Sequence, residues 1–459
     1  METAFVELAR SARQAAGARI SGEVRAISGL TLTAAGLERT LGIGNRCRVL
    51  GRHGPVLGEV VGISPDGMCV LPFGTWHGVA AGDAVEALEG DDAPLEPCDA
   101  WRGRVIDGLG RPLDGLGPLP AGGRPCAARA APPPAFDRRR IGARIATGVA
   151  AVDLFAPLCR GQRMGVFAGS GVGKSTLLSM LARRSEADVV VIGLVGERGR
   201  EVQDFVQADL GPEGMARSVL VVSTGDEPPL MRRQAAWTAT AVAERFRDEG
   251  RQVLLLIDSV TRFALAQREI GLAAGEPPAQ RGFPPTTFAE LAPLLERAGP
   301  GGEGQGDVTA IYTVLVEGDD MNDPVADTVR GILDGHLVLD RAVAEHGRYP
   351  PIDLRRSVSR MMPGCHSPRE AALASAARRA AARHADMEDL IRLGAYRAGS
   401  DPEVDRAIAL DGPLTALLNQ AKHEAIDPAG GFDALERLLV EAGIEANAVP
   451  PPARTTTGD

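Results

Sequence analysis

The residues best suited to chemistry lie in a glycine-rich segment, AGSGVGKS, at residues 168–175. It follows an apolar run at residues 164–167 and precedes a helix-forming run at residues 176–181. In a strand–loop–helix setting, glycines let backbone N–H groups turn inward around phosphate oxygens, and the start of the helix attracts negative charge. We therefore predict a phosphate-binding loop formed by Gly169, Ser170, Gly171, Val172, Gly173, Lys174, Ser175 and Thr176.

Two side chains of this loop have separate predicted roles. Lys174 would reach the β- and γ-phosphates of a nucleoside triphosphate, and the Ser175 hydroxyl would bind Mg²⁺. The general pattern opens with glycine where this sequence has Ala168, so ordinary backbone angles are expected there. A glycine-rich turn without function is the alternative, but it would not explain Lys-Ser between a strand and a helix.

A second acidic position completes the predicted metal site. The run VLLLID ends at Asp258, about 80 residues after the loop, and has the form of a buried strand that terminates in a carboxylate. An Asp in that place often caps the following helix instead. Its pairing with the phosphate loop favours the metal role for Asp258.

Hydrolysis further needs a group that orients and polarises the attacking water. Glu197 follows the apolar run at residues 189–195, at the sheet edge where open α/β folds hold their ligands. It lies in GERGRE beside Arg198 and Arg200. The spacing leaves two interpretations open, a catalytic carboxylate or a surface Glu paired with these arginines.

The elements that must position these residues alternate along the chain. Buried strands are predicted at residues 163–168, 189–195, 218–223, 253–257 and 310–316, with helical segments at 175–184 and 234–249. This alternation predicts a RecA-like α/β P-loop domain with a mostly parallel sheet over residues 93–362. The proline-rich residues 132–134 are predicted to be a loop within it.

Four further segments flank this domain. Residues 1–19 have apolar residues near helical spacing and predict an amphipathic arm, with a frayed terminus as the alternative. Short β-prone runs at 22–27, 46–50, 57–63, 68–71 and 84–86 predict a small β-barrel over residues 20–92. Residues 363–446 predict an α-helical domain, and residues 447–459 a disordered tail.

Composition narrows the class of protein. The net charge of −10 disfavours nucleic acid as a partner, because phosphate neutralisation needs a basic face. The six scattered cysteines form no C-x-x-C pair, which disfavours a zinc site. The first residues lack the apolar block of a signal peptide, and no run reaches the roughly 18 apolar residues of a membrane helix. A cytoplasmic protein is expected.

Several longer segments resemble one family closely. AGSGVGKS, GLVGERGREV, IDSVTRFALAQREIGLAAGEPP, YTVLVEGDDMNDP and RYPPIDLRRSVSRMM are similar to the ATPase of the flagellar type III export apparatus, a relative of the ATP synthase catalytic subunit. GRVIDGLGRPLDGLGP resembles the entry to the nucleotide domain in both families. The resemblance covers about residues 20–446 and is weaker in the last domain.

The resemblance implies roles that the residues alone leave open. Glu197 matches the family's catalytic carboxylate, with Arg198 beside it as a further catalytic candidate. Tyr349 matches the position whose ring packs against adenine. Arg360, in SVSR, matches the arginine that a neighbouring subunit inserts toward the γ-phosphate. ATP and Mg²⁺ are the implied substrate and cofactor.

The resemblance also implies partners. One chain carries both Glu197 and Arg360, which fits a homo-hexamer with six equivalent interfaces. The family implies a stator-like regulator at the N-terminal arm and a coiled-coil central stalk at the ring pore and C-terminal domain. The export gate, export substrates and their chaperones complete the expected partners, at the inner-membrane base of the flagellar export apparatus. The loop at residues 276–285, EPPAQRGFPP, resembles the family's pore loop.

Three other functions are compatible with the same nucleotide-binding core. A virulence-type injectisome ATPase would have the same fold and chemistry. A hexameric nucleic-acid motor shares the core, but the acidic composition speaks against it. A non-catalytic nucleotide-binding subunit would commonly lack the carboxylate found here at Glu197.

Overall fold

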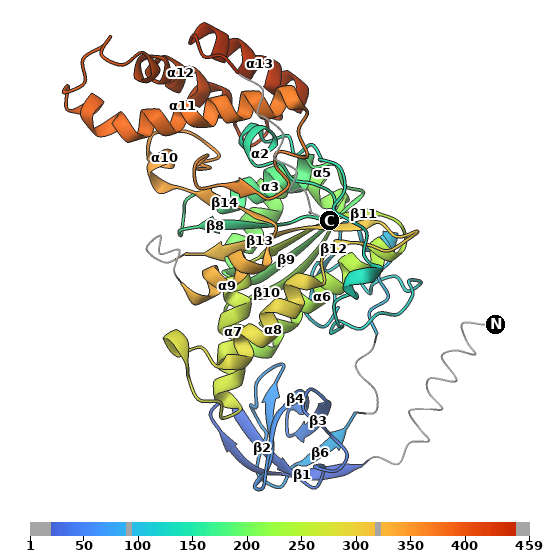
Figure 1. Cartoon of the computed structure of the whole chain (residues 1–459). Coiled ribbons are helices and arrows are strands. Elements are labelled where there is room, and N and C mark those ends of the chain that lie inside the picture. The colour runs from blue at the N-terminus through green and yellow to red at the C-terminus, as the bar shows by residue number, and fades with distance from the viewer. Residues whose placement is uncertain (1–19, 89–93, 317–322, 447–459) are drawn as a thin grey trace, which may run out of the picture. The chain divides into compact units, whose positions relative to one another are not determined.

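The computed structural model describes residues 20–88, 94–316 and 323–446, and the chain forms two compact units (Figure 1). The expected arm, tail and part of YTVLVEGDDMNDP lie outside the described residues. The first unit contains the barrel together with residues 227–231 and 266–287. The second unit contains the sheet of the nucleotide domain and the C-terminal helices.

The barrel is closed by six strands in the order β1-β2-β5-β4-β3-β6. Buried side chains from alternating strand positions fill its interior, among them Leu32, Val60 and Val70. The predicted barrel is confirmed, but the second strand was not predicted because its sequence, TLTAA, is short and weakly apolar. The strands are β1 Ser21–Ser28, β2 Thr31–Ala35, β3 Arg46–Gly51, β4 Gly54–Ser64, β5 Gly67–Pro72 and β6 Ala84–Ala87.

The second unit is built on a sheet in the order β15-β14-β8-β13-β11-β9-β10-β7, with β12 beside β13. Neighbours from β14 to β7 run parallel, whereas β12 and β15 pair antiparallel. The strands are β7 Val105–Asp107, β8 Arg163–Ala168, β9 Val189–Glu197, β10 Ser218–Thr224, β11 Gln252–Asp258, β12 Gly299–Pro300, β13 Asp307–Leu315, β14 Gly335–Leu339 and β15 Val358–Ser359. The five predicted strands of the parallel sheet are present.

Helices cover both faces of this sheet, as the near-continuous apolar strands require (Figure 1). In Figure 1, α3 and α5 lie on one face and α6 and α8 on the other. The helices of the region are α2 Ala150–Phe155, α3 Lys174–Arg184, α4 Gly199–Asp204, the π-helical η3 Phe205–Leu210, α5 Gly211–Ala216, α6 Pro229–Asp248, α7 Val260–Ala273, α8 Pro285–Glu296, α9 Pro324–Ile332 and α10 Arg341–Glu345. Short 3₁₀ turns lie at Asp99–Trp101, Ala135–Asp137 and Gln280–Gly282.

The C-terminal residues form three helices, α11 Pro368–Arg392, α12 Pro402–Leu418 and α13 Pro428–Glu441. Each starts at a proline that follows an N-cap residue, Ser367, Asp401 or Asp427, whose side chain accepts backbone N–H bonds. Their buried leucines and alanines join the core formed by α3 and the central strands. The C-terminal helices are therefore continuous with the core that carries the phosphate loop.

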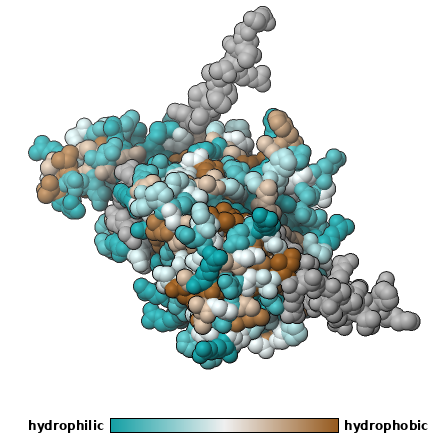
Figure 2. Space-filling model, turned by 90° about the horizontal axis from the view of Figure 1, so that it is seen from below, coloured by the Kyte–Doolittle hydropathy of each residue, from teal (hydrophilic) through white to brown (hydrophobic). Residues whose placement is uncertain are grey.

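The surface view in Figure 2 shows apolar patches separated by hydrophilic residues on the face that it presents. Among the described residues, no helix is long and apolar enough to cross a membrane.

Candidate functional site

The phosphate loop joins the end of β8 to the start of α3, as the glycine spacing predicts. Gly171 and Gly173 have φ angles of 75° and 106°, values that side-chain-bearing residues rarely adopt. Ala168 is the last residue of β8 and has no positive φ, so this position does not require glycine. Ser170, Gly171 and Ser175 are exposed, so the loop surface is open to a ligand.

Lys174, the first residue of α3, lies between the two predicted acidic residues. Its Nζ is 2.5 Å from Asp258 Oδ1 and 3.1 Å from Glu197 Oε1. Because β11 and β9 are adjacent and parallel, their carboxyl ends bring Asp258 and Glu197 to the same sheet edge as the loop. Lys174, Glu197 and Asp258 are therefore brought together, although 84 residues separate the first from the last.

Electrostatics at this edge favour a base that works near neutral pH. Burial, followed by repulsion from Asp258, raises the pKa of Glu197 to about 7, although Lys174 opposes the shift. Burial lowers the pKa of Lys174, but attraction from Asp258 and Glu197 outweighs it and leaves that pKa raised. The lysine stays cationic, and the glutamate can take up a proton at neutral pH.

Two residues that support the site were not predicted. The Thr313 hydroxyl, fully buried in β13, donates to Asp258 Oδ1 at 2.7 Å and fixes that carboxylate. Arg341 Nη2, at the start of α10, donates to the Ser170 carbonyl at 2.9 Å. A threonine within the apolar run AIYTVL beside the acidic strand was the available signal for Thr313. No comparable signal pointed to Arg341.

Tyr349 lies next to the loop. A Cβ added to Gly173 would be 3.9 Å from Tyr349 Cδ1 and 3.6 Å from Pro351 Cδ. The Tyr349 side chain is 44% exposed, so a face of its ring remains available for stacking. Sequence positions 173 and 349 are thus neighbours in space.

Arg198 stands apart from this cluster. Its side chain is 79% exposed and lies 3.4 Å from Glu201 Oε1, three residues along α4. The structure therefore pairs Arg198 with Glu201.

Arg360 lies near the amino ends of the parallel strands, whereas the phosphate loop of the same chain lies at their carboxyl ends. It follows β15, whose Ser359 pairs with Gly335 at the start of β14, whereas the loop begins beside Leu339 at the end of β14. Four residues of strand span about 13 Å. Arg360 is exposed and borders a pocket of 390 Å³ that is lined by Asp327, Arg330, Gly331, Leu333, Gly335, His336, Val358 and Arg360.

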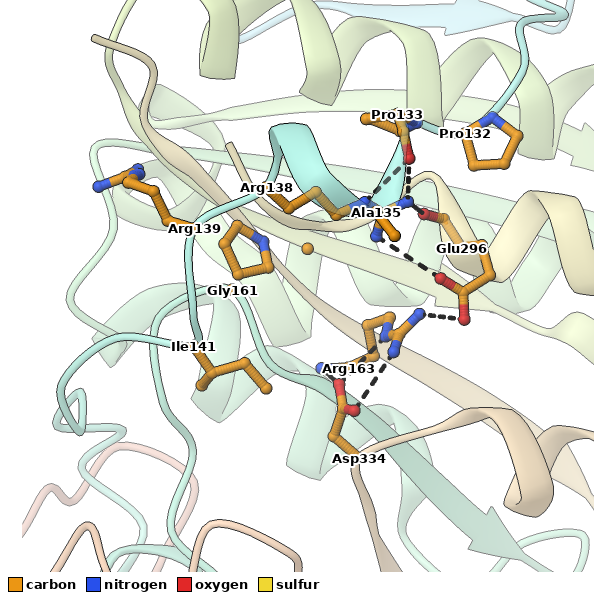
Figure 3. Close-up of a pocket in the computed structure, with 12 residues that line it drawn as sticks. Pro132, Pro133, Ala135, Arg138, Arg139, Ile141, Gly161, Arg163, Glu296 and Asp334 are labelled. Carbon is orange, nitrogen blue, oxygen red and sulfur yellow. Dashed lines mark hydrogen bonds and ion pairs between the residues drawn. The ribbon is translucent and has the colours of Figure 1, made fainter. Parts of the chain in front are cut away.

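A second pocket, of 360 Å³, also lies at the starts of the strands (Figure 3). Arg163 stands between Glu296 and Asp334 there, with its Nη1 2.5 Å from Glu296 Oε1 and its Nε 3.1 Å from Asp334 Oδ2. The Arg138 guanidinium also contacts Glu296. These charges are paired with one another, so we assign the residues of this pocket a structural role rather than a ligand-binding one.

The groups suited to binding a metal ion or phosphate lie at the phosphate loop and the neighbouring strand ends. The Asp258 carboxylate and Ser175 hydroxyl are hard oxygen donors of the kind that Mg²⁺ prefers. Loop glycines, the start of α3 and Lys174 present positive potential to phosphate. The arrangement suits phosphoryl transfer from a Mg²⁺-bound nucleoside triphosphate to water.

Comparison with known proteins identifies the family. Residues 148–359 match the ATP synthase alpha/beta family nucleotide-binding domain, and residues 366–437 match the T3SS EscN ATPase C-terminal domain. The chain is 50% identical over 427 residues to a flagellum-specific ATP synthase of Caulobacter vibrioides, covering 92% of this chain and 96% of that protein. It is 47% identical to a type 3 secretion system ATPase of Xanthomonas euvesicatoria, covering 91% and 94%.

A solved structure agrees with these matches. The assembled ATPase EscN of enteropathogenic E. coli, in complex with its central stalk EscO, has a TM-score of 0.82 and 39% identity, covering 91% of this chain and all of that one. The barrel, the nucleotide-binding sheet and the C-terminal helices fall within this likeness. The chain therefore belongs to the type III export ATPases, the family that contains the flagellum-specific ATP synthases.

Proposed function

We propose that the protein hydrolyses Mg²⁺-bound ATP at a site completed by a neighbouring copy, within a homo-hexameric ring that drives flagellar protein export. The observation that carries this proposal is the separation, within one chain, between Arg360 and the phosphate loop at the carboxyl ends of the strands. In the part of the chain that the structure describes, Lys174, Glu197 and Asp258 lie together at the carboxyl ends of the strands, whereas Arg360 follows β15 beside the start of β14. A second copy can supply its own Arg360.

In this mechanism the loop residues 169–176 bind the triphosphate, and Lys174 neutralises its β- and γ-oxygens. Ser175 and Asp258 would hold Mg²⁺, which neutralises charge on the phosphates when bound. Thr313 keeps the Asp258 carboxylate in place by donating to Oδ1.

Glu197 orients the attacking water and accepts its proton, for which a pKa of about 7 is well suited. Water attacks the γ-phosphorus as the bond to the ADP oxygen breaks, so that ADP and phosphate leave. Arg360 of the neighbour stabilises the charge that spreads over the γ-phosphate oxygens. The Tyr349 ring packs against adenine, and Arg198 remains a catalytic candidate through its place beside Glu197 in the sequence.

A solved relative supports the proposed ring and its central stalk. EscN is described as assembled and bound to its central stalk EscO, which supports a ring and a coiled-coil stalk at the pore and C-terminal domain here. We extend the proposal to a stator-like regulator at residues 1–19, and to the export gate, export substrates and chaperones. The protein would act in the cytoplasm at the inner-membrane base of the export apparatus, without nucleic acid.

The 47% identity to a type 3 secretion system ATPase keeps an injectisome role as the second candidate. The chemistry is the same in both settings. Deletion of the gene distinguishes them, because loss of motility supports flagellar export and retained motility supports the injectisome.

The test is ATP turnover per subunit against protein concentration. Shared sites predict specific activity that rises with concentration and is nearly lost in Glu197→Gln and in Arg360→Ala. Arg355→Ala, which removes an exposed arginine five residues before Arg360, is the matched control and should stay active. Mixing the two inactive variants should restore activity. Activity that is independent of concentration and survives Arg360→Ala would refute the shared site.

A further inference from the structure

The loop between α12 and α13, residues 419–426, makes an unusual set of contacts with the nucleotide domain. Both main-chain polar groups of Tyr349 bond to it. Tyr349 N donates to Asn419 Oδ1 at 2.9 Å, and Gln420 N donates to the Tyr349 carbonyl at 2.6 Å. Two consecutive residues of the C-terminal domain therefore form hydrogen bonds with the backbone of Tyr349, which borders the phosphate loop.

Gln420 also forms hydrogen bonds with a second segment of the nucleotide domain, at Gly148 and Ala150. Its side chain is buried, with 3% of the residue exposed. Oε1 accepts from Ala150 N at 2.7 Å, and Nε2 donates to the Gly148 carbonyl at 3.0 Å. A buried amide with both ends satisfied across two domains is costly to displace, because each unpaired group would lose its hydrogen bond without gaining water.

The same loop reaches the far end of α3, the helix that begins at Lys174. Arg184 Nη2 donates to the His423 carbonyl at 3.2 Å, and Arg183 Nη2 donates to the Lys422 carbonyl at 2.5 Å. The loop thus contacts the tyrosine on one side and the base of the phosphate-loop helix on the other.

We infer that Asn419 and Gln420 are positioning residues for the base of the bound nucleotide, which they place by holding the backbone of Tyr349. This inference rests on the proposed function, in which Tyr349 packs against adenine. Both hydrogen bonds reach Tyr349 through its main chain, and the position of that main chain determines where the ring lies.

A base-specific effect separates positioning from general damage. Asn419 is the residue of choice because it is exposed, so its truncation leaves no cavity. Asn419→Ala should raise the dissociation constant of ADP and the KM for ATP about two- to tenfold, the net value of one hydrogen bond. The kcat should stay within about twofold of wild type, and inhibition by inorganic tripolyphosphate, which has no base, should not change.

Three further variants complete the experiment. Asn419→Asp keeps an oxygen acceptor for Tyr349 N and should restore ADP binding. Tyr349→Ala should weaken ADP at least as much as Asn419→Ala. Arg383→Ala, which breaks contacts to Asp401 and Glu403 within the C-terminal helices, is the matched control and should bind ADP as wild type does.

Direct ADP binding by the full-length protein, measured by calorimetry, gives a readout apart from hydrolysis. The inference is overturned by unchanged ADP affinity in Asn419→Ala or in Tyr349→Ala, or by equal weakening of ADP and tripolyphosphate. If the wild type hydrolyses ATP while Asn419→Ala is indistinguishable from it, only this inference fails. If the wild type does not hydrolyse ATP at all, the proposed function fails with it.

Discussion

The protonation of Glu197 makes the pH dependence of hydrolysis a direct test of its role. A general base acts only when deprotonated, so activity is lost as pH falls through its pKa. Burial raises the pKa of Glu197 from 4.5 to about 7. About a tenth of the molecules then carry the charged carboxylate at pH 6 and about nine tenths at pH 8. We expect kcat/KM to rise about tenfold over that interval.

A substitution next to Glu197 should move this profile. A hydrogen bond from Glu201 is among the contributions that raise the pKa of Glu197. In Glu201→Gln, an amide N–H can donate to the charged Glu197 carboxylate and stabilise it. The midpoint should therefore move to lower pH. Glu213→Gln, an exposed glutamate in α5, is the matched control and should leave the midpoint unchanged.

The assay measures initial rates at saturating Mg²⁺ between pH 5.5 and pH 9, at ATP concentrations well below KM. The titration of ATP itself is common to all three proteins, so differences between the profiles belong to the enzyme. A wild-type profile that is flat between pH 6 and pH 8 would refute the role of Glu197 as a base with raised pKa. Coincident profiles for wild type and Glu201→Gln would refute the contribution assigned to Glu201.

Three other substitutions test the site and its support. Thr313→Val removes the donor to the buried Asp258 carboxylate, worth about 1.5–3 kcal/mol, and should lower the thermal midpoint and Mg²⁺-dependent activity. Thr240→Val, which loses a hydrogen bond to Ala236 within α6, should change activity little. Gly173→Ala places a Cβ at φ 106°, a strain of about 1–3 kcal/mol, and should weaken ADP binding in calorimetry without unfolding the protein. Arg297→Ala removes the buried partner of Glu244, whose side chain is 13% exposed, and should cost about 3–5 kcal/mol in denaturant unfolding. A fold that keeps its full stability would contradict this reasoning.

The sequence was sufficient to predict a structural element or a site residue wherever a local pattern has a single physical explanation. Glycine spacing between an apolar run and a helix predicts the loop, because few other contexts place Lys-Ser there. Asp258 was predicted on the same ground, as the polar end of a buried strand. Strand β2 was missed because five residues with two alanines carry too little β-propensity to stand out.

Contacts made through tertiary packing could not be predicted in this way. Thr313 meets Asp258 across 55 residues, and Asn419 meets Tyr349 across 70, so no spacing rule connects them. Arg360 has no local feature that separates it from other exposed arginines, and its role was inferred from resemblance alone. Its position at the starting edge of the strands becomes evident only once the register of β14 and β15 is known.

This position bears on how copies must assemble. Glu197 lies at the carboxyl edge of the sheet and Arg360 at the amino edge, so one chain presents its two contributions on different sides. A two-fold contact buries the same patch of both copies, whereas a head-to-tail contact joins different patches and can close into a ring. In the proposed shared site, head-to-tail assembly therefore lets every copy both give and receive an arginine.

The head-to-tail arrangement makes the mixing experiment quantitative. In an equal mixture of Glu197→Gln and Arg360→Ala chains, an interface is complete only when an Arg360→Ala chain supplies Glu197 and its neighbour supplies Arg360. Random assembly gives that order at about one interface in four, so restored activity should approach about a quarter of wild type when interfaces act independently. Strict cooperation around the ring would lower this value, and a site contained in one chain would restore nothing. A recovery well above one quarter would contradict random head-to-tail assembly, because no other order of the two chains joins an intact Glu197 to an intact Arg360.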